Sequence, residues 1–422
     1  MKITAANEPY YGLTRTTCYL GTVAQAAMAN IWPLLFVLLR NAFGLTYLQL
    51  ASLISVIYIV RLITDLLFSK AADKFGFRPF LALSTGLTAA GFLLFAAVPL
   101  LTDKPYLGFI AATVIFSVGG GLNDILASPL INQLPGRSKG GNLAFLHTVY
   151  SFGQASVIML TSLALFLFGD GNWQWIVAAW ALLPIAAFLL YLLVPLPDIQ
   201  SQPKQSSREI AVGSDFLICF FIMFFGAGAE CTMLQWSSTF MEKAAGLPKL
   251  LGDYAGVLMF ALLMGLARLS YALFSKKFDL AKFMLYGAMA AVICYPLTAL
   301  SEVSWLNLAG CALTGFAIGM LWPGTLVLGS ERYPNGGAWL FAMLALGGDG
   351  GASFCPWLSG LLVDNAAKIP FLANLGAGLT SEQLGLRSAL AFSTLYPLIA
   401  VILLMVFIKR RGKNSLFLSE SK

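Results

Sequence analysis

The sequence predicts an all-α membrane protein of about twelve transmembrane helices, arranged as two parallel repeats of six. Hydrophobic residues make up 59% of the 422 positions and charged residues only 11%, whereas soluble globular chains carry roughly 25% charged residues. The mean hydropathy is +0.80. Apolar stretches long enough to span a bilayer, about 20 residues, follow one another along the chain. The two halves also repeat rare polar residues in register.

The apolar stretches are separated by charged or turn-rich points. In lipid the backbone must satisfy its own hydrogen bonds, and these stretches are too long for barrel strands, so each is predicted to be an α-helix. The spans expected in the first half are residues 16–40, 46–69, 79–101, 106–133, 141–168 and 173–196. Those expected in the second half are residues 215–241, 250–275, 282–300, 304–331, 337–363 and 388–408.

The domain organisation follows from these spans. Residues 1–196 form the expected first half and residues 214–422 the second, which ends in a short basic tail. The polar stretch 197–213 is the expected cytoplasmic linker between them.

Basic residues are distributed unequally between the two ends of the predicted helices. Of the 26 Lys and Arg residues, 18 fall on the side of the chain termini, and Arg61 and Arg268 fall inside spans. The six on the other side are Arg40, Lys104, Lys243, Lys249, Lys368 and Arg387. Because cytoplasmic loops carry the excess of basic residues, both termini are expected in the cytoplasm. The net charge of +7 then follows from topology and does not indicate nucleic acid binding.

Several kinds of site are not expected. The six cysteines lack the spacing of metal ligands, so neither disulfides nor a metal are expected. No H-E-x-x-H motif or nucleophile and base on one helix indicates an enzyme, and no signal peptide is apparent. Short loops without an N-x-S/T sequon fit a bacterial cell membrane. We expect no cofactor other than a coupling ion, a small-molecule substrate and lipid as partners, and a monomer.

The two halves match at an offset of 207 residues. The matching positions are Tyr47 with Tyr254, Arg61 with Arg268, and Leu62 with Leu269; after a one-residue gap, the Leu-Phe-Ser-Lys run 67–70 matches 273–276 and Asp73 matches Asp279. Six spans in each half give the halves the same orientation, related by an axis along the membrane normal.

The loop after the second predicted span resembles the signature of the major facilitator superfamily, G-x-x-x-D-R/K-x-G-R-R/K. Asp73, Lys74, Gly76 and Arg78 match it, whereas Ser69 replaces the first glycine and a phenylalanine replaces one basic residue. The resemblance implies the major facilitator fold and transport by alternating access. It also implies that Asp73 and Arg78 help to close the cytoplasmic side. The alternative is an ordinary positively charged loop.

Seven ionisable residues fall well inside predicted spans, away from their ends, where charge is costly and therefore indicates function. They are Arg61, Asp65, Asp124, His147, Glu230, Arg268 and Asp349. Arg61 and Asp65 are four residues apart on one helix face, so we expect them to neutralise each other. Arg268 has alanine at the equivalent position, so its counter-charge is expected from Glu230 or Asp349. We assign Arg61, Asp65 and Arg268, with the loop residues Asp73 and Arg78, to a gating and charge network.

The fourth predicted span resembles the fucose permease branch of the superfamily, with its pattern G-x-G-x-x-E followed by small residues, Asn and Pro. Gly119 and Gly121 match the glycines, Asp124 replaces the acid, Ser128 replaces the Asn, and Pro129 matches. The resemblance implies that Asp124 takes part in proton-coupled sugar binding. The branch also has an acid on its first span, which this chain lacks. Its first span offers only the amides Gln25 and Asn30, and Asn123 precedes Asp124.

Polar stripes mark the fifth and seventh predicted spans. His147, Tyr150 and Gln154 share one helical face, and the imidazole is expected to take up a proton, to bind a sugar hydroxyl, or to be a packing residue. The segment from Glu230 through Gln235 and Trp236 resembles the seventh helix of sugar transporters near the fucose permease group. An amide and an indole suit a sugar, which has both hydroxyls and an apolar ring face. The alternative for Trp236 is a membrane-interface position.

The function expected from these residues is secondary active transport of a small polar solute, a sugar, by proton symport. Proton coupling is assigned to Asp124, His147, Glu230 and Asp349, the last within a glycine cluster. Substrate binding is assigned to Gln25, Asn30, Asn123, His147, Tyr150, Gln154, Glu230, Gln235, Trp236 and Trp322. The alternatives are Na⁺ coupling, export of amphipathic compounds and, more remotely, a channel or an intramembrane enzyme.

Overall fold

Every regular element in the part of the chain that the computed structural model describes is helical. The structure describes residues 8–68, 76–135, 139–197, 213–274, 279–333, 336–376 and 378–420. The first-half elements are α1 (Glu8–Phe43), α2 (Tyr47–Phe68), α4 (Phe77–Leu101), α5 (Pro105–Gln133), α6 (Lys139–Phe168), η2 (Asp170–Asn172), α7 (Trp173–Trp180) and α8 (Leu182–Leu193). The second-half elements are α10 (Ser214–Lys243), α11 (Lys249–Leu251), η3 (Gly252–Leu258), α12 (Met259–Phe274), α13 (Leu280–Leu300), α14 (Ser304–Ile318), α15 (Leu321–Arg332), α16 (Gly337–Asn365), η4 (Ala366–Lys368), α17 (Pro370–Leu375), α18 (Ser381–Phe392) and α19 (Leu395–Glu420).

Each of the twelve predicted spans has a helical counterpart, so the all-α membrane fold is confirmed. Within the described residues, ten helical stretches are long and apolar enough to cross a membrane. The other two predicted spans correspond to α2 and α16, which pack against each other.

Several spans are interrupted, which the apolar pattern did not predict. The sixth breaks between α7 and α8, the tenth between α14 and α15, and the twelfth between α18 and α19. The eighth begins as a π-helix, η3. A π-helical turn is rare and often marks a functional position.

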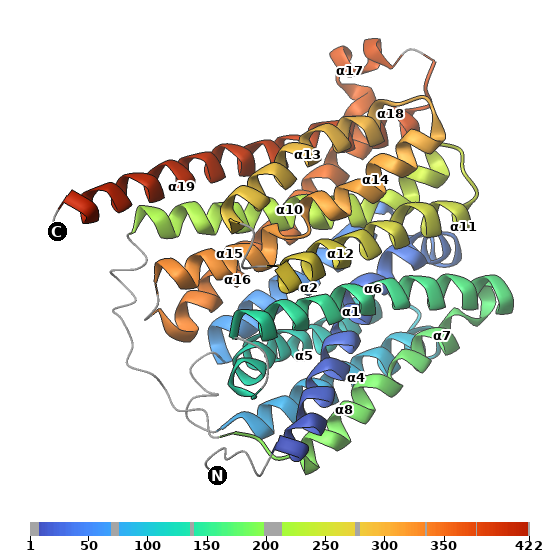
Figure 1. Cartoon of the computed structure of the whole chain (residues 1–422). Coiled ribbons are helices and arrows are strands. Elements are labelled where there is room, and N and C mark those ends of the chain that lie inside the picture. Colours follow the sequence, from blue (N-terminus) through green and yellow to red (C-terminus); the bar gives the residue numbers. More distant parts are fainter. Residues whose placement is uncertain are drawn as a thin grey trace.

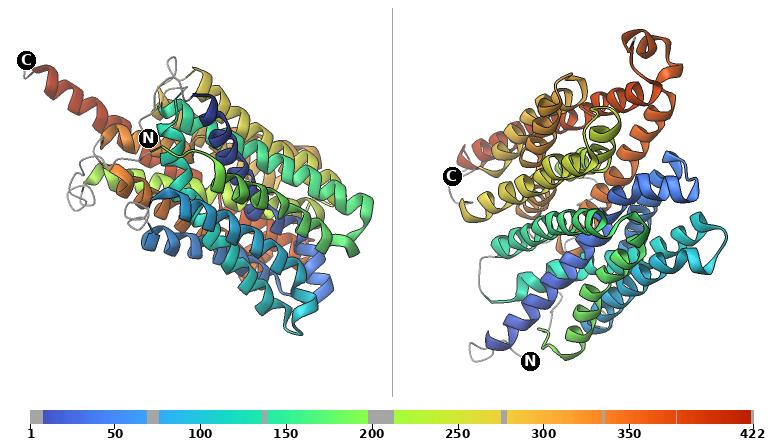
Figure 2. Two further views of the ribbon diagram at one scale, coloured as in Figure 1. Left: turned by 90° about the horizontal axis from the view of Figure 1, so that it is seen from below. Right: turned by 90° about the vertical axis from the view of Figure 1, so that its right-hand side faces the viewer.

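The helices form one bundle with a seam between its two sets of helices. In Figure 1 the helices up to α8 occupy the lower part and those from α10 the upper part, and Figure 2 shows the same separation from a second side. One hydrophobic core lies entirely between Phe216 and Phe407, and another is drawn mainly from residues 27–181. Across the seam, α2 packs on α16 and α6 packs on α12. The start of α1 and the end of α19 lie at the same end of the bundle.

Glycines allow the closest helix contacts around α16. A Cβ atom built on Gly351 would lie 1.8 Å from the carbonyl oxygen of Phe224 on α10. A Cβ on Gly348 would lie 2.6 Å from the Trp322 ring. The glycine cluster around Asp349 therefore brings the backbone of α16 against α10 and under an aromatic side chain.

Candidate functional site

A polar cavity of about 80 Å³ lies in the centre of the bundle, at the seam. Such a volume has room for several water molecules, since one needs roughly 10–15 Å³ measured in this way. Eleven residues singled out from the sequence line it: Gln25, Asn30, Arg61, Asn123, Asp124, His147, Tyr150, Gln154, Glu230, Arg268 and Trp322. They come from α1, α2, α5, α6, α10, α12 and α15, so helices of both sets contribute.

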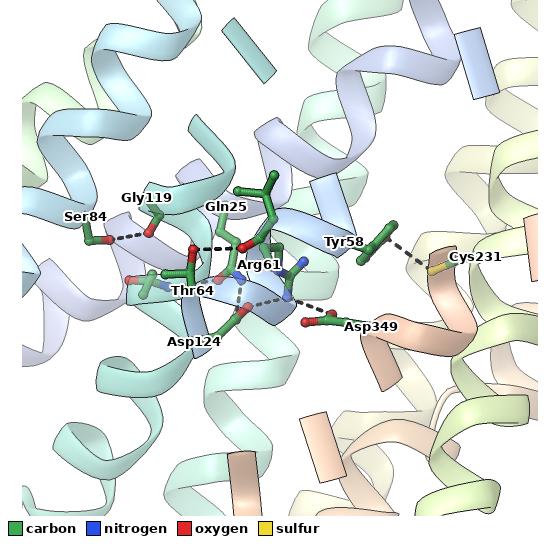
Figure 3. A network of polar contacts seen from close by, with 11 residues as sticks. Gln25, Tyr58, Arg61, Thr64, Ser84, Gly119, Asp124, Cys231 and Asp349 are labelled. Atoms are coloured by element: carbon green, nitrogen blue, oxygen red, sulfur yellow. Dashed lines mark hydrogen bonds and ion pairs between the residues drawn. The ribbon is translucent and has the colours of Figure 1, made fainter. Parts of the chain in front are cut away.

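Arg61 on α2 forms ion pairs with carboxylates from both sides of the seam. Its Nη2 atom contacts Oδ2 of Asp124 on α5 and lies 3.6 Å from Oδ1 of Asp349 on α16 (Figure 3). In the described residues Asp65 is not one of its ion-pair partners, so the expected neutralisation within α2 is wrong. A shared helix face allows an i, i+4 pair, but the long guanidinium side chain reaches across to other helices instead.

Amide side chains form a chain of hydrogen bonds along the cavity wall. Asn123 Nδ2 donates to Gln25 Oε1 at 2.8 Å, and Gln25 Nε2 donates in turn to Asp124 Oδ1. A second amide pair links α6 to α1, where Gln154 Nε2 donates to Asn30 Oδ1 at 2.8 Å. The amides therefore hold the carboxylate of Asp124 in place and present both donors and acceptors.

Arg268 on α12 is the second arginine of the cavity, and its counter-charge is Glu230. Its Nη2 atom lies 3.0 Å from Glu230 Oε2 on α10, its Nη1 donates to Ser151 Oγ at 2.8 Å, and its Nε donates to the carbonyl of Gly319 at 2.8 Å. The carbonyl of Gly319 is available because the tenth span is interrupted there. All three contacts hold the guanidinium behind the carboxylate, which faces the cavity.

His147, Tyr150 and Trp322 line the cavity beside these pairs. The Nε2 atom of His147 is buried and has no hydrogen-bond partner in the described part of the chain. A buried unpaired ring nitrogen is costly, so a bound solute or water would stabilise it. The Trp322 ring lies against Gly348 and offers its face as an apolar surface.

Some lining residues were missed by the sequence analysis. They are Thr22, Tyr58, Ala127, Leu146, Cys231 and Leu234; Ser128, which belongs to the pattern of the fourth predicted span, lines the cavity as well. The Tyr58 hydroxyl lies 3.3 Å from Cys231 Sγ across the seam, and Arg61 lies over its ring at 5.4 Å. Tyr58 precedes Arg61 by three residues, so the helical spacing could have identified it.

Other predicted site residues lie outside the cavity lining. Trp236 is fully buried, donates to the carbonyl of Pro356 at 3.2 Å and does not line this cavity. Gln235 is buried, and neither its Nε2 nor its Oε1 has a hydrogen-bond partner among the residues described. Asp65 and Asp349 are buried behind the cavity wall. Asp73 and Lys74 fall outside the described residues.

Arg78 lies at the end of α8, away from the cavity. It donates to the carbonyls of Tyr191 at 2.9 Å, Leu192 at 3.0 Å and Val194 at 2.8 Å. These are the carbonyls that a helix leaves unsatisfied at its C-terminus, where a positive charge is also favourable. In this structure Arg78 therefore anchors the end of the sixth span.

The seam is closed at the end opposite the chain termini. An apolar cluster joins Leu34, Ala155 and Ile158 to Val257 and Ala261. Beyond it, the Tyr254 hydroxyl donates to the carbonyl of Met159 at 3.1 Å. The cavity lies on the other side of this cluster and reaches Thr22 and Leu146, toward the end that holds the termini.

A buried carboxylate reinforces this closure. Asp253 on η3 accepts hydrogen bonds from Ser238 on α10 at 2.5 Å and from Ser162 on α6 at 3.2 Å. It also pairs with Lys249 at 3.2 Å. Because Ser162 belongs to the opposite set of helices, this contact joins the two sides of the seam.

Comparisons with known proteins agree with this architecture. The family profile described as "Major Facilitator Superfamily" matches residues 17–355. No curated protein matches the chain by sequence. Among solved structures, the proton:xylose symporter XylE bound to 6-bromo-6-deoxy-D-glucose aligns with a TM-score of 0.70 and 15% identity, over 95% of this chain and 96% of that one.

Two further solved structures have the same fold. The human organic anion transporter MFSD10 (TETRAN) aligns with a TM-score of 0.68 and 14% identity, over 93% of this chain and 99% of that one. A bacterial homolog of the human lysosomal transporter Spinster, in an inward-facing and occupied conformation, aligns with a TM-score of 0.69 and 13% identity, over 95% and 97%. At these identities the likeness concerns the fold alone.

Proposed function

Because the chain belongs to the major facilitator superfamily of secondary transporters, we propose that it moves a small neutral polyhydroxylated solute, a sugar, by proton symport. The observation that carries this proposal is the composition of the cavity wall. It combines four amides, two arginine–carboxylate pairs, two tyrosines and one indole within a single small space.

The charge arrangement favours a neutral solute. Arg61 is paired with Asp124 and Arg268 with Glu230, and each carboxylate is more exposed than its guanidinium, with side-chain exposures of 27% against 7% and 12% against 3%. The cavity therefore presents carboxylate oxygens whose charge is already balanced from behind. Such oxygens accept hydrogen bonds from hydroxyl groups, and the amides supply both donors and acceptors.

An exporter of amphipathic compounds is the alternative transporter. Its cavity would need a large apolar wall, whereas this one has few aromatic residues and many polar groups that are already hydrogen-bonded to each other. We therefore favour the sugar.

Proton coupling is proposed to depend on Asp124. Its carboxylate is more exposed than that of Glu230, and it lines the cavity, where water can reach it. Protonation would weaken its attraction to Arg61 and change the relative energies of the two access states, which is how an ion drives a conformational equilibrium. His147 and Glu230 face the same space and are further candidates for the proton.

The proposal extends to topology. We propose residues 1–196 and 214–422 as two halves that rock about the cavity, with residues 197–213 as the linker and with both termini in the cytoplasm of a cell membrane. The cavity then opens inward in this structure. The excess of basic residues on the side of the termini supports this orientation.

Uptake by the purified protein tests the proposal. The full chain is reconstituted in liposomes, and a panel of labelled neutral hexoses and pentoses is presented with and without an inward proton gradient. We expect at least one sugar to accumulate, and a protonophore to abolish the accumulation. If no sugar accumulates and an amphipathic dye is extruded instead, the exporter replaces this proposal.

A further inference from the structure

One nitrogen of Arg61 faces two carboxylates that belong to opposite sides of the seam. The Nη2 atom contacts Asp124 on α5 and lies 3.6 Å from Asp349 on α16, and Figure 3 shows the guanidinium between the two. Asp124 faces the cavity, whereas Asp349 is 1% exposed. The same cation thus connects a cavity carboxylate to a carboxylate buried in the packing between α2 and α16.

The hydrogen-bonding capacity of this group is only partly used. The Nε atom of Arg61, both carboxylate oxygens of Asp349 and Oδ1 of Asp65 are buried without a hydrogen-bond partner in the described ranges. Leaving such groups unpaired is costly, and a guanidinium fits a carboxylate best through two parallel hydrogen bonds. A turn of the guanidinium toward Asp349 would give the unpaired oxygens of Asp349 a hydrogen-bond donor.

The cavity side of the contact is tied to the solute-binding amides. Asp124 accepts a hydrogen bond from Gln25, which itself accepts one from Asn123. A solute hydroxyl that engages Gln25, or a proton that neutralises Asp124, weakens the hold of Asp124 on Arg61. Asp349 is then the remaining partner for the cation.

We propose that Arg61 is a positioning residue that exchanges its partner between Asp124 and Asp349, and that this exchange couples the cavity to the packing of α2 on α16. The inference rests on the proposed proton-coupled transport. It explains how a change of charge in the cavity alters the contact between α2 and α16. The other titratable groups around the guanidinium are Tyr58 and Asp65 on α2, Tyr150 on α6 and Cys231 on α10. Neutralisation of Asp124 shifts the guanidinium of Arg61 toward Asp349.

Hydrogen–deuterium exchange of the full chain in nanodiscs tests the exchange without any solute or gradient. Asp124→Asn should shift Arg61 onto Asp349 and slow amide exchange in peptides that cover the middle of α16. Asp349→Asn should leave Arg61 on Asp124 and speed amide exchange in the same peptides. We expect each change to be about tenfold in rate, as for the loss or gain of one strong ion pair.

The matched variants separate this role from simple destabilisation. In Asp349→Glu the amide exchange rate of α16 should stay near that of the wild type, because the variant keeps the carboxylate. Asp170→Asn replaces an exposed carboxylate in η2 and should change nothing. If Asp349→Asn does not fold, the slowing expected for Asp124→Asn still tests the inference.

Two results would overturn the proposal: changes of the same sign in both asparagine variants, or unchanged exchange in Asp124→Asn. Either can occur while proton-driven sugar uptake is observed, which would refute the partner exchange and leave the proposed function intact. Conversely, a chain that transports no sugar but shows the opposite changes in α16 would retain the exchange and lose the sugar.

Discussion

The hydroxyl of Ser162 on α6 donates a hydrogen bond to the buried carboxylate of Asp253 on η3, at 3.2 Å across the seam. In Ser162→Ala, Asp253 would keep Ser238 and Lys249 but lose its partner from the opposite helices. We expect the closed end to weaken by about 1–2 kcal/mol. The closed-to-open ratio would change roughly five- to thirtyfold.

Cysteine accessibility measures this shift. A cysteine introduced at Ala155, within the apolar cluster of the closed end, should react with maleimide faster when combined with Ser162→Ala. Ser156→Ala is the control, since Ser156 donates to the carbonyl of Phe152 on its own helix, at 2.8 Å, and has no partner across the seam among the described residues. Equal labelling rates in the Ser162 and Ser156 variants would mean that the Asp253 contact does not hold the seam closed.

Adjacent glycines on α16 give a matched pair for testing helix packing. Gly351→Ala would place a Cβ 1.8 Å from the carbonyl oxygen of Phe224, which is part of a helix backbone and has no room to move. Overpacking of this kind costs about 1–3 kcal/mol or more, so the apparent melting temperature in detergent should fall. Gly350→Ala meets only the Phe224 ring edge at 3.4 Å and should melt near the wild type. Similar melting of both variants would contradict the close approach of α16 to α10.

Arg78 provides a test between a gating and an anchoring role. Arg78→Ala removes three hydrogen bonds to carbonyls at the end of α8. We expect a loss of about 1–3 kcal/mol in stability, measured by thermal unfolding, with transport reduced only in proportion to the folded fraction. Lys104→Ala, at an exposed position, is the control. Full stability with a large loss of transport rate would favour the gate instead.

The sequence was sufficient to predict the spans because apolar length is a local property of the chain. It also located most polar residues of the cavity, since a charged or amide side chain within an apolar stretch is conspicuous wherever it later packs. The ion-pair partners of these residues could not be predicted in the same way. Arg61 pairs with Asp124 and Asp349, which lie on other helices, and no spacing along α2 encodes those contacts.

Asp253 illustrates a second limit. It lies near the start of the predicted span 250–275, where a carboxylate is ordinary, so its sequence position gave no reason to single it out. It is buried by the packing of η3 against α6, α10 and α14. Similarly, Trp236 is of a residue type common in sugar-binding sites but packs against α16. The contact between α10 and α16 decides which face of α10 is covered.

Asp124→Asn should separate binding from coupling. The amide keeps the size of the side chain and its contact with Gln25, so the affinity for the transported sugar should change by less than about threefold, as for loss of a modest hydrogen bond. Proton-driven accumulation should be lost, while counterflow without a gradient continues. Binding to the purified protein and uptake into liposomes measure the two quantities. Unchanged accumulation would remove Asp124 from the coupling mechanism.

The ion pair of Arg268 and Glu230 predicts an asymmetric double-mutant cycle. Glu230→Gln leaves a buried guanidinium without its counter-charge, which costs about 3–5 kcal/mol. Arg268→Gln should cost less, because the carboxylate of Glu230 faces the cavity and can be hydrated there. In the double variant neither charge remains, so it should be more stable than Glu230→Gln alone despite carrying one more substitution. Thermal unfolding of the four proteins gives the coupling energy, and strictly additive losses would show that the pair does not stabilise the fold.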